Sequence, residues 1–236
     1  MLDTVSPSLA PVLASRMDVP PPRLGIRYDA DGNFLPEPGN TIVSHLERRS
    51  ASEAAVLQVR ERLLTLPGAD CLAFTPAPSL HMTLFQGVID TRRRHPYWPA
   101  DIPLHLAIDQ MTRRMMTRLD GFDGCGPFSV KPTEVTPTGI TVEGVTEKDA
   151  LVMQAWRDKL ARTFSYRHPD HDSYTFHITF AYVIRGIPDA AAAQWQRVLD
   201  ESLALLQRDA PVIALREPAF CRFRDMKHFE ELLILA

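Results

Sequence analysis

The chain has 236 residues, with 26 Lys and Arg against 29 Asp and Glu, and a formal charge of −3 at pH 7. This length supports one sizeable domain with a hydrophobic core and excludes a peptide-sized or disulfide-stapled scaffold. The charge excludes the strong overall positive field that drives non-specific nucleic-acid binding, so any polyanion must be met locally.

The first part of the chain is rich in proline. Residues 1–24 contain five prolines and predict an extended arm that lies over the body or hangs free. The Asp-Gly-Asn sequence at 31–33, between Tyr28 and Phe34, predicts a small hairpin. Residues 41–43 then predict a short strand.

Helices and strands are predicted to alternate through the rest of the first half. Ser50 and Glu53 form a capping box, and apolar residues follow at helical spacing until Pro67 and Gly68 stop the helix. The predicted elements are a helix over 51–66, strands over 72–74 and 80–88, and a second helix that begins at Asp101 and runs through Leu119.

The second half repeats this order. Its predicted elements are a hairpin over 128–145, a helix capped at Thr146, a strand over 174–184, a helix opened by Asp189, and closing strands near 212–215 and 232–235. The cap at Ser50 precedes His81 by 31 positions, and the cap at Thr146 precedes His177 by 31. Equal spacing from helix start to the same strand motif indicates a duplicated unit.

The duplicated motif is Leu-His-Met-Thr-Leu at 80–84 and Phe-His-Ile-Thr-Phe at 176–180. Because strand side chains alternate between faces, the His and Thr of each copy point one way and the apolar residues point the other. If the two strands lie side by side, two imidazoles and two hydroxyls converge in one groove. The hydroxyls can donate to phosphoryl oxygens, while a neutral imidazole accepts a proton and a charged imidazole gives one.

Two His-x-Thr motifs on strands 96 residues apart resemble the signature of the 2H phosphoesterase superfamily. This superfamily includes RNA 2′,5′-ligase/cyclic phosphodiesterases, plant cyclic nucleotide phosphodiesterases and the vertebrate myelin enzyme. Asp31-Gly32 with residues 35–41, and Phe223 to Met226 with Phe229, resemble a microbial subgroup of unknown function. The resemblance covers about residues 25–236.

The resemblance implies a bilobal α+β fold with pseudo-twofold symmetry, in which antiparallel sheets form a central groove and helices lie outside. A single domain over 25–236 is expected, with one lobe at about 40–120, the other at about 127–215, and C-terminal strands completing the sheets. His81 and His177 are then the acid and base, and Thr83 and Thr179 bind the phosphate. Which histidine is the base stays open.

The implied reaction needs no metal and no cofactor. Typical members of the superfamily open a 2′,3′-cyclic or related phosphodiester with water, so a small phosphodiester, a nucleotide or an RNA end is the expected substrate. Two alternatives remain on the sequence alone. The groove can bind a phosphate ligand without turnover, or His81, His177 and one of His168 or His171 can hold a metal ion.

Several other polar residues are weaker candidates for substrate binding. Strand alternation puts Tyr182 and Gln86 on the face opposite the motif unless a bulge intervenes. The basic run at 92–95 can reach a polyphosphate, although a solvated loop is the commoner reading of such a run. The candidates carried forward are Asn40, Thr41, Tyr182, Arg222 and Arg224.

The cysteines and the apolar segments bear on location. Cys71, Cys125 and Cys221 are an odd number at wide spacing, which indicates neither a disulfide framework nor a thiolate zinc site. The N-terminus lacks a basic n-region, and no stretch approaches 18 uninterrupted apolar residues. A reducing cytoplasm is therefore the expected location.

Overall fold

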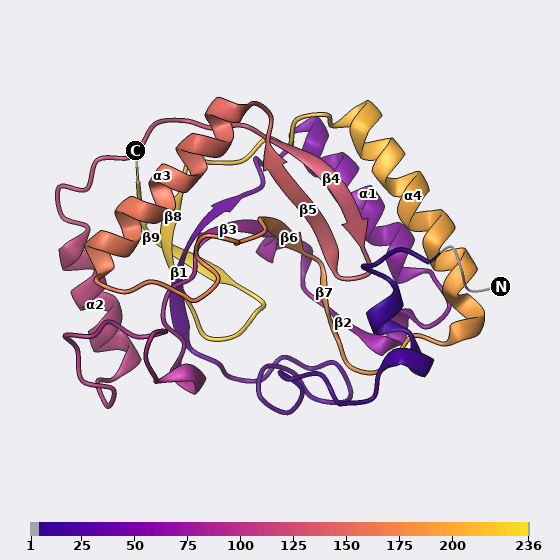
Figure 1. The fold of residues 1–236 in the computed structure, drawn as a ribbon, viewed down its shortest axis with the longest axis horizontal. Coiled ribbons are helices and arrows are strands. Elements are labelled where there is room, and N and C mark those ends of the chain that lie inside the picture. The colour runs from indigo at the N-terminus through magenta and orange to yellow at the C-terminus, as the bar shows by residue number, and fades with distance from the viewer. Residues whose placement is uncertain (1–4, 236) are drawn as a thin grey trace.

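The computed structural model describes residues 5–235, which form a mixed α+β fold. Its helices lie at the outside of the molecule and its strands run through the middle (Figure 1). The helices are α1 (Ala51–Leu64), α2 (Ile108–Arg118), α3 (Glu147–Phe164) and α4 (Ala192–Asp209). The strands are β1 (Gly39–His45), β2 (Leu72–Phe74), β3 (His81–Phe85), β4 (Val130–Thr136), β5 (Gly139–Gly144), β6 (His177–Thr179), β7 (Ala181–Val183), β8 (Ala219–Phe223) and β9 (Phe229–Ile234).

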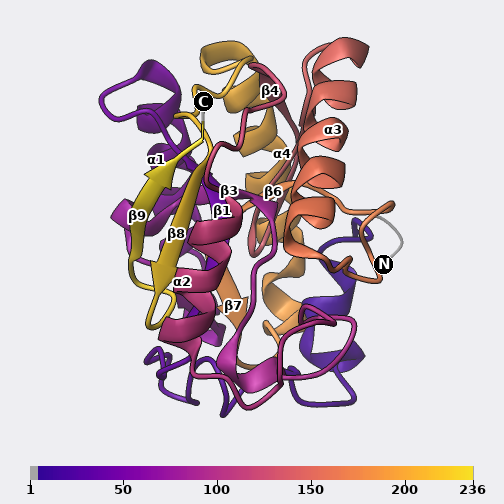
Figure 2. The ribbon, with the colours of Figure 1, turned by 90° about the vertical axis from the view of Figure 1, so that its left-hand side faces the viewer.

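Seven of these strands form one antiparallel sheet in the order β4-β5-β6-β3-β1-β8-β9, and β2 pairs with β7 in a small second sheet. The seven-stranded sheet is continuous through its centre, where β6 from the second half of the chain meets β3 from the first. The C-terminal hairpin of β8 and β9 forms one edge of this sheet, beside α2 in the side view of Figure 2.

The helices pair across the two halves of the chain. Helix α1 packs against α4, and α2 packs against α3. Helix α3 also contacts β3 and β5, while α4 contacts β4. The repeated elements therefore interleave in space, and the apolar stripes of the helices bury a shared core that includes Trp156 and Trp195.

Most predicted elements are present where their local signals are strong. The Ser50 hydroxyl accepts from the Glu53 amide at the start of α1, and Thr146 with Asp149 forms a complete capping box at the start of α3. The hairpin predicted over 128–145 is formed by β4 and β5. The two helix starts, the Thr146 cap and the hairpin are confirmed, while the Glu53 carboxylate accepts from the Arg49 amide, so the box at Ser50 is only half formed.

The helix predicted to begin at Asp101 begins only at Ile108, so this start is wrong. Pro103 disfavours helical backbone at Ile102, whose carbonyl accepts a hydrogen bond from Trp98 Nε1 at 3.1 Å. The strand predicted near 212–215 is also wrong, since this segment makes only isolated bridges through Ile213 and Leu215. The sheet is closed instead by β8 and β9.

The proline-rich arm lies over the body. Leu9 and Leu13 are buried, and Leu13 forms a parallel bridge with Ile187. The Ser6 amide donates to Gln196 Oε1 at 2.7 Å, which ties the arm to α4. The first four residues of the predicted arm lie outside the described residues.

In the part of the chain that the structure describes, no helix combines the length and apolar character needed to cross a membrane.

Candidate active site

The two His-x-Thr motifs lie on the central strand pair, β3 and β6. Met82 pairs with Ile178 in an antiparallel register. This register sets His81 opposite Thr179 and Thr83 opposite His177, which is a crosswise arrangement about a local twofold axis. Met82 and Ile178 are fully buried on the helix side of the sheet. The apolar residues of the motifs therefore fix the strands, and the four polar side chains face a common cavity.

The two imidazole rings are held in the same way. His81 Nδ1 lies 2.7 Å from the Ser79 carbonyl oxygen, and His177 Nδ1 lies 2.9 Å from the Thr175 carbonyl oxygen. A carbonyl can only accept, so each Nδ1 carries a hydrogen and donates it. This tautomer leaves Nε2 of each ring as the atom that can take up or give a proton.

The surroundings of the two histidines differ. His81 is half-buried, and its ring centroid lies 4.1 Å from that of Phe229 and 5.8 Å from that of His45. Desolvation, with a smaller contribution from the charges of the nearby His45 and His177, lowers the pKa of His81 to about 3. His81 is thus neutral at physiological pH. His177 is exposed at the rim.

The cavity at the motifs has a volume of about 260 Å³, close to the lower end of the range for small-molecule sites. Asn40, Thr41 and Tyr182 line it, as do both motif pairs. Its other polar lining residues are Arg23, Arg27, Thr75, Ser79, Gln86, Arg92 and Tyr174. A second, more apolar groove of about 650 Å³ adjoins it and shares His177, Thr179 and Tyr182.

Asn40 and Thr41 reach the cavity with most of their hydrogen-bonding capacity already used. Asn40 Oδ1 accepts from the Val88 amide at 3.1 Å, and Asn40 Nδ2 donates to Thr112 Oγ1 at 3.1 Å. The Thr41 hydroxyl donates to the Phe85 carbonyl at 3.2 Å. These bonds tie β1 to β3 and α2, so both residues hold the cavity wall in place.

A bulge brings Tyr182 to the motif face. The amides of Phe180 and Ala181 both donate to the Thr138 carbonyl, at 2.7 and 3.2 Å. When two successive amides donate to one carbonyl, the strand contains one extra residue at that point, which is a β-bulge. The side chains beyond the bulge, which lies between β6 and β7, therefore alternate in the opposite sense. Tyr182 therefore shares the cavity with His177 instead of packing behind the strand.

A second bulge has the same effect in β3. Ile42 pairs with Phe85 and Val43 pairs with Thr83, so Leu84 has no partner in β1. The Leu84 carbonyl instead accepts from Arg157 Nη1 of α3 at 2.9 Å. Gln86, two residues beyond the bulge, consequently lines the cavity.

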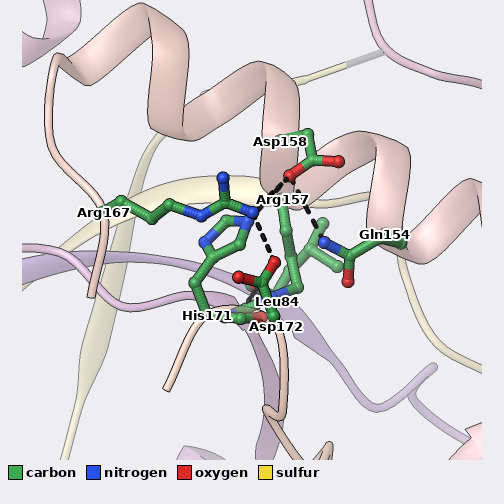
Figure 3. Close-up of polar contacts among 7 residues, drawn as sticks. All are labelled: Leu84, Gln154, Arg157, Asp158, Arg167, His171 and Asp172. Carbon is green, nitrogen blue, oxygen red and sulfur yellow. Dashed lines mark hydrogen bonds and ion pairs between the residues drawn. The ribbon is translucent and has the colours of Figure 1, made fainter. Parts of the chain in front are cut away.

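Arg157 is buried at the centre of the polar cluster in Figure 3. Its Nη2 donates to the His171 carbonyl at 3.3 Å, and its guanidinium carbon lies 4.0 Å from the ring centroid of Tyr174. His171 Nε2 lies 2.9 Å from Asp158 Oδ1 in the same cluster. One cation thus joins β3, the loop at 168–173 and the Tyr174 wall of the cavity. Burial raises the pKa of Tyr174 to about 12, so its phenol stays protonated and can donate.

Arg222 and Arg224 do not belong to the cavity lining. Both are exposed, and Arg222 forms a bidentate pair with Glu230 through bonds of 2.7 and 3.0 Å. Strand alternation in β8 puts Phe223, the residue between them, toward the cavity. The face that the two arginines share is therefore the one away from the motifs.

His168 and His171 also lie apart from the motif histidines. Both are buried, with ring centroids 6.4 and 6.3 Å from that of Phe85, and neither lines the cavity. Among residues 5–235, no three His, Cys, Asp or Glu side chains are grouped so that they could hold a metal ion.

The sequence left several lining residues without a role. Arg23 lies at the end of the arm and Arg27 just after it, and Tyr174 and Phe229 flank the histidines. Arg92 belongs to the basic run at 92–95, for which the sequence favours a solvated loop over contact with a polyphosphate. The basic run at 92–95 indicates that a cation could reach the cavity, but no local pattern identifies which of its side chains points inward.

The antiparallel α+β fold and the crosswise His-x-Thr strands place the chain in the 2H phosphoesterase superfamily. The chain belongs to the family described as 2H-phosphodiest, domain of unknown function (DUF1868), whose model matches residues 27–141. A crystal structure of the conserved protein of unknown function ATU0111 from Agrobacterium tumefaciens is similar, with 46% identity and a TM-score of 0.96. The match covers 98% of this chain and 99% of that chain. No curated protein matches the chain.

Proposed function

We propose that the protein is a metal-independent phosphodiesterase that opens a 2′,3′-cyclic or related phosphodiester of a nucleotide or RNA end. The observation that carries this proposal is the crosswise pairing of His81 with Thr179 and of Thr83 with His177 around one cavity. Membership of the 2H phosphodiesterase family supports phosphodiester chemistry in general. The adjoining apolar groove gives room for a nucleoside beside His177.

We assign the roles of the two histidines from the difference in their surroundings. His81 is neutral and can accept the proton of the attacking water at Nε2, while a protonated His177 gives a proton to the leaving ribose oxygen. The water oxygen bonds to phosphorus as the bond from phosphorus to that ribose oxygen breaks. Thr83 and Thr179 donate to the non-bridging oxygens. The products are a phosphate monoester and a free hydroxyl, and solvent restores both protonation states.

A hydrolysis screen tests the proposal directly. Purified protein is incubated with 2′,3′-cyclic nucleotides, ADP-ribose cyclic phosphate and 2′,5′-linked oligonucleotides, with and without a chelator. We expect turnover of at least one class at the same rate in both conditions, because imidazoles and hydroxyls perform every step. Loss of turnover with chelator supports a metal hydrolase, and ligand binding without turnover supports a binding module. Either result contradicts the proposal.

Turnover should show a bell-shaped dependence on pH. Activity falls at low pH when His81 becomes protonated and can no longer accept a proton, and it falls at high pH when the general acid no longer carries the proton that it must give. Because the pKa of His81 is lowered to about 3, the acid limb is expected well below 6.5, the ordinary value for histidine. An acid limb centred near pH 6.5 in kcat/KM contradicts His81 as the base.

Acid unfolding is the control for this profile. A histidine whose pKa is depressed in the folded state contributes stability above pH 6.5, and this stability is lost as pH falls toward the folded pKa. Burial lowers the pKa values of both His81 and His168 to about 3, so folding weakens over the same range. Circular dichroism at each pH separates unfolding from titration of the base.

A further inference from the structure

Three arginines line the same cavity as the histidines although none of them belongs to a motif. Arg23 lies at the end of the N-terminal arm, Arg27 lies between the arm and β1, and Arg92 ends the 3-10 helix Asp90–Arg92. They are neighbours, because the charges of Arg23 and Arg27 both act on the Arg92 guanidinium. The cavity therefore has a cationic part beside the motif pairs.

This part carries more positive than negative charge. The buried Glu37 carboxylate accepts from Arg27 Nε at 2.6 Å, from Arg23 Nη1 at 3.3 Å and from Thr91 Oγ1 at 2.7 Å. Arg92 has no carboxylate partner among residues 5–235, and its buried Nε has no hydrogen-bond acceptor there. Arg23 and Arg27 thus share one carboxylate and Arg92 has none, which leaves two positive charges in excess on a chain whose overall charge is −3.

Aromatic rings orient two of these cations. The guanidinium carbon of Arg92 lies 4.3 Å from the ring centroid of Tyr97, and that of Arg27 lies 5.1 Å from the ring centroid of Tyr182. A guanidinium stacked on a ring keeps its N–H groups available at the edge, where they match the oxygens of a phosphate. Burial lowers the pKa of Arg92, and the charges of Arg23 and Arg27 lower it further. An anion bound there would offset this repulsion between the three guanidinium charges.

We propose that Arg23, Arg27 and Arg92 form a second anion subsite, which binds a phosphate group of the substrate other than the one that is opened. This inference rests on the proposed function, because the motif pairs are assigned to the scissile phosphodiester. The cavity of about 260 Å³ and the adjoining groove of about 650 Å³ together suit a nucleotide-sized molecule. The substrate class is therefore a cyclic nucleotide that carries an additional terminal phosphate.

The test compares two substrates that differ only in this group. A nucleoside 2′,3′-cyclic phosphate is assayed with a 5′-hydroxyl and with a 5′-phosphate, and kcat/KM is measured for both. The wild-type protein is expected to prefer the 5′-phosphorylated form by about 10-fold to 100-fold, as charge-assisted hydrogen bonds to a phosphate provide. Arg92→Gln is expected to remove most of this preference, and Arg92→Lys to retain part of it.

Arg94→Gln is the matched control. Arg94 lies in the same loop, is exposed and does not line the cavity, so the substitution removes the same charge from the chain but should leave the preference unchanged. Equal loss in Arg94→Gln and Arg92→Gln means that general charge is responsible and overturns the subsite. Melting temperatures of the three variants show that each is folded.

Binding of inorganic pyrophosphate separates this inference from the proposed function. Isothermal titration calorimetry is expected to show binding that Arg92→Gln weakens at least 10-fold and Arg94→Gln does not. If the protein hydrolyses cyclic nucleotides without preferring the 5′-phosphate, the subsite is overturned and the proposed function stands. If it hydrolyses no substrate of the screen but binds pyrophosphate through Arg92, the proposed function is overturned and the anion site stands.

Discussion

Replacement of either His81 or His177 by alanine is expected to lower kcat for cyclic phosphodiester hydrolysis by about 10² to 10⁴-fold, the usual contribution of one positioned acid or base. The register of β3 and β6 puts the two rings in one site, because each histidine lies opposite the threonine of the other motif. The double variant should therefore lose little more than the worse single variant. Initial rates under saturating substrate give the comparison.

His105→Ala serves as the control, because His105 is exposed and does not line the cavity. Binding of the substrate or of its opened product should persist in the His81 and His177 variants, since Thr83 and Thr179 remain. Variants that fold and bind but turn over as fast as the wild-type protein would show that the imidazoles do not transfer protons. Because Phe229 packs on the His81 ring, circular dichroism must first establish that His81→Ala is folded.

Thr83 and Thr179 deserve separate substitution, since their proposed role differs from that of the histidines. Valine keeps the β-branched shape that suits a strand and removes the hydroxyl. We expect Thr83→Val and Thr179→Val each to lower kcat/KM by about 10-fold, as the loss of one hydrogen bond to a charged oxygen predicts. If kcat falls by a larger factor than KM rises, the hydroxyl stabilises mainly the transition state. Unchanged kcat and KM would contradict contact between the threonine and the phosphate.

The sequence predicted those parts of the fold whose signals are local. The capping box of α3 lies within four residues, and the motif strands alternate over five, so both can be read without any tertiary contact. The pairing of the motifs followed from their duplication. Local patterns also explain why α2 was predicted to begin too early, because its apolar spacing continues back across Pro103, which disfavours helical backbone at Ile102.

The rest of the cavity depends on contacts between distant segments. Alternation alone puts Tyr182 and Gln86 on the wrong face, and the bulges that correct this are stabilised by the Thr138 carbonyl and by Arg157. Neither partner is near its bulge in sequence. The proposed arginine subsite comes from two loops, and loops have no repeating pattern of side-chain directions. The sequence therefore could not distinguish Arg92 from its exposed neighbour Arg94.

Arg157 offers the sharpest test of how the fold supports the cavity. Arg157→Met is expected to lower the free energy of unfolding by about 2 to 4 kcal/mol, because the buried carbonyls of Leu84 and His171 each lose a donor that water cannot replace. Methionine fills much of the same volume, so lost packing contributes little. Urea unfolding followed by circular dichroism measures the change.

Arg162→Met is the matched control on the same helix. Arg162 is exposed in the last turn of α3, and its replacement should cost less than about 1 kcal/mol. Without the Arg157 bond, the β3 bulge loses its main restraint, and Tyr174 loses the cation against its ring. We therefore expect Arg157→Met to lower kcat/KM even without urea, where the variant is fully folded, although Arg157 itself does not line the cavity. A variant as stable and as active as Arg162→Met would show that the bulge holds without this bond.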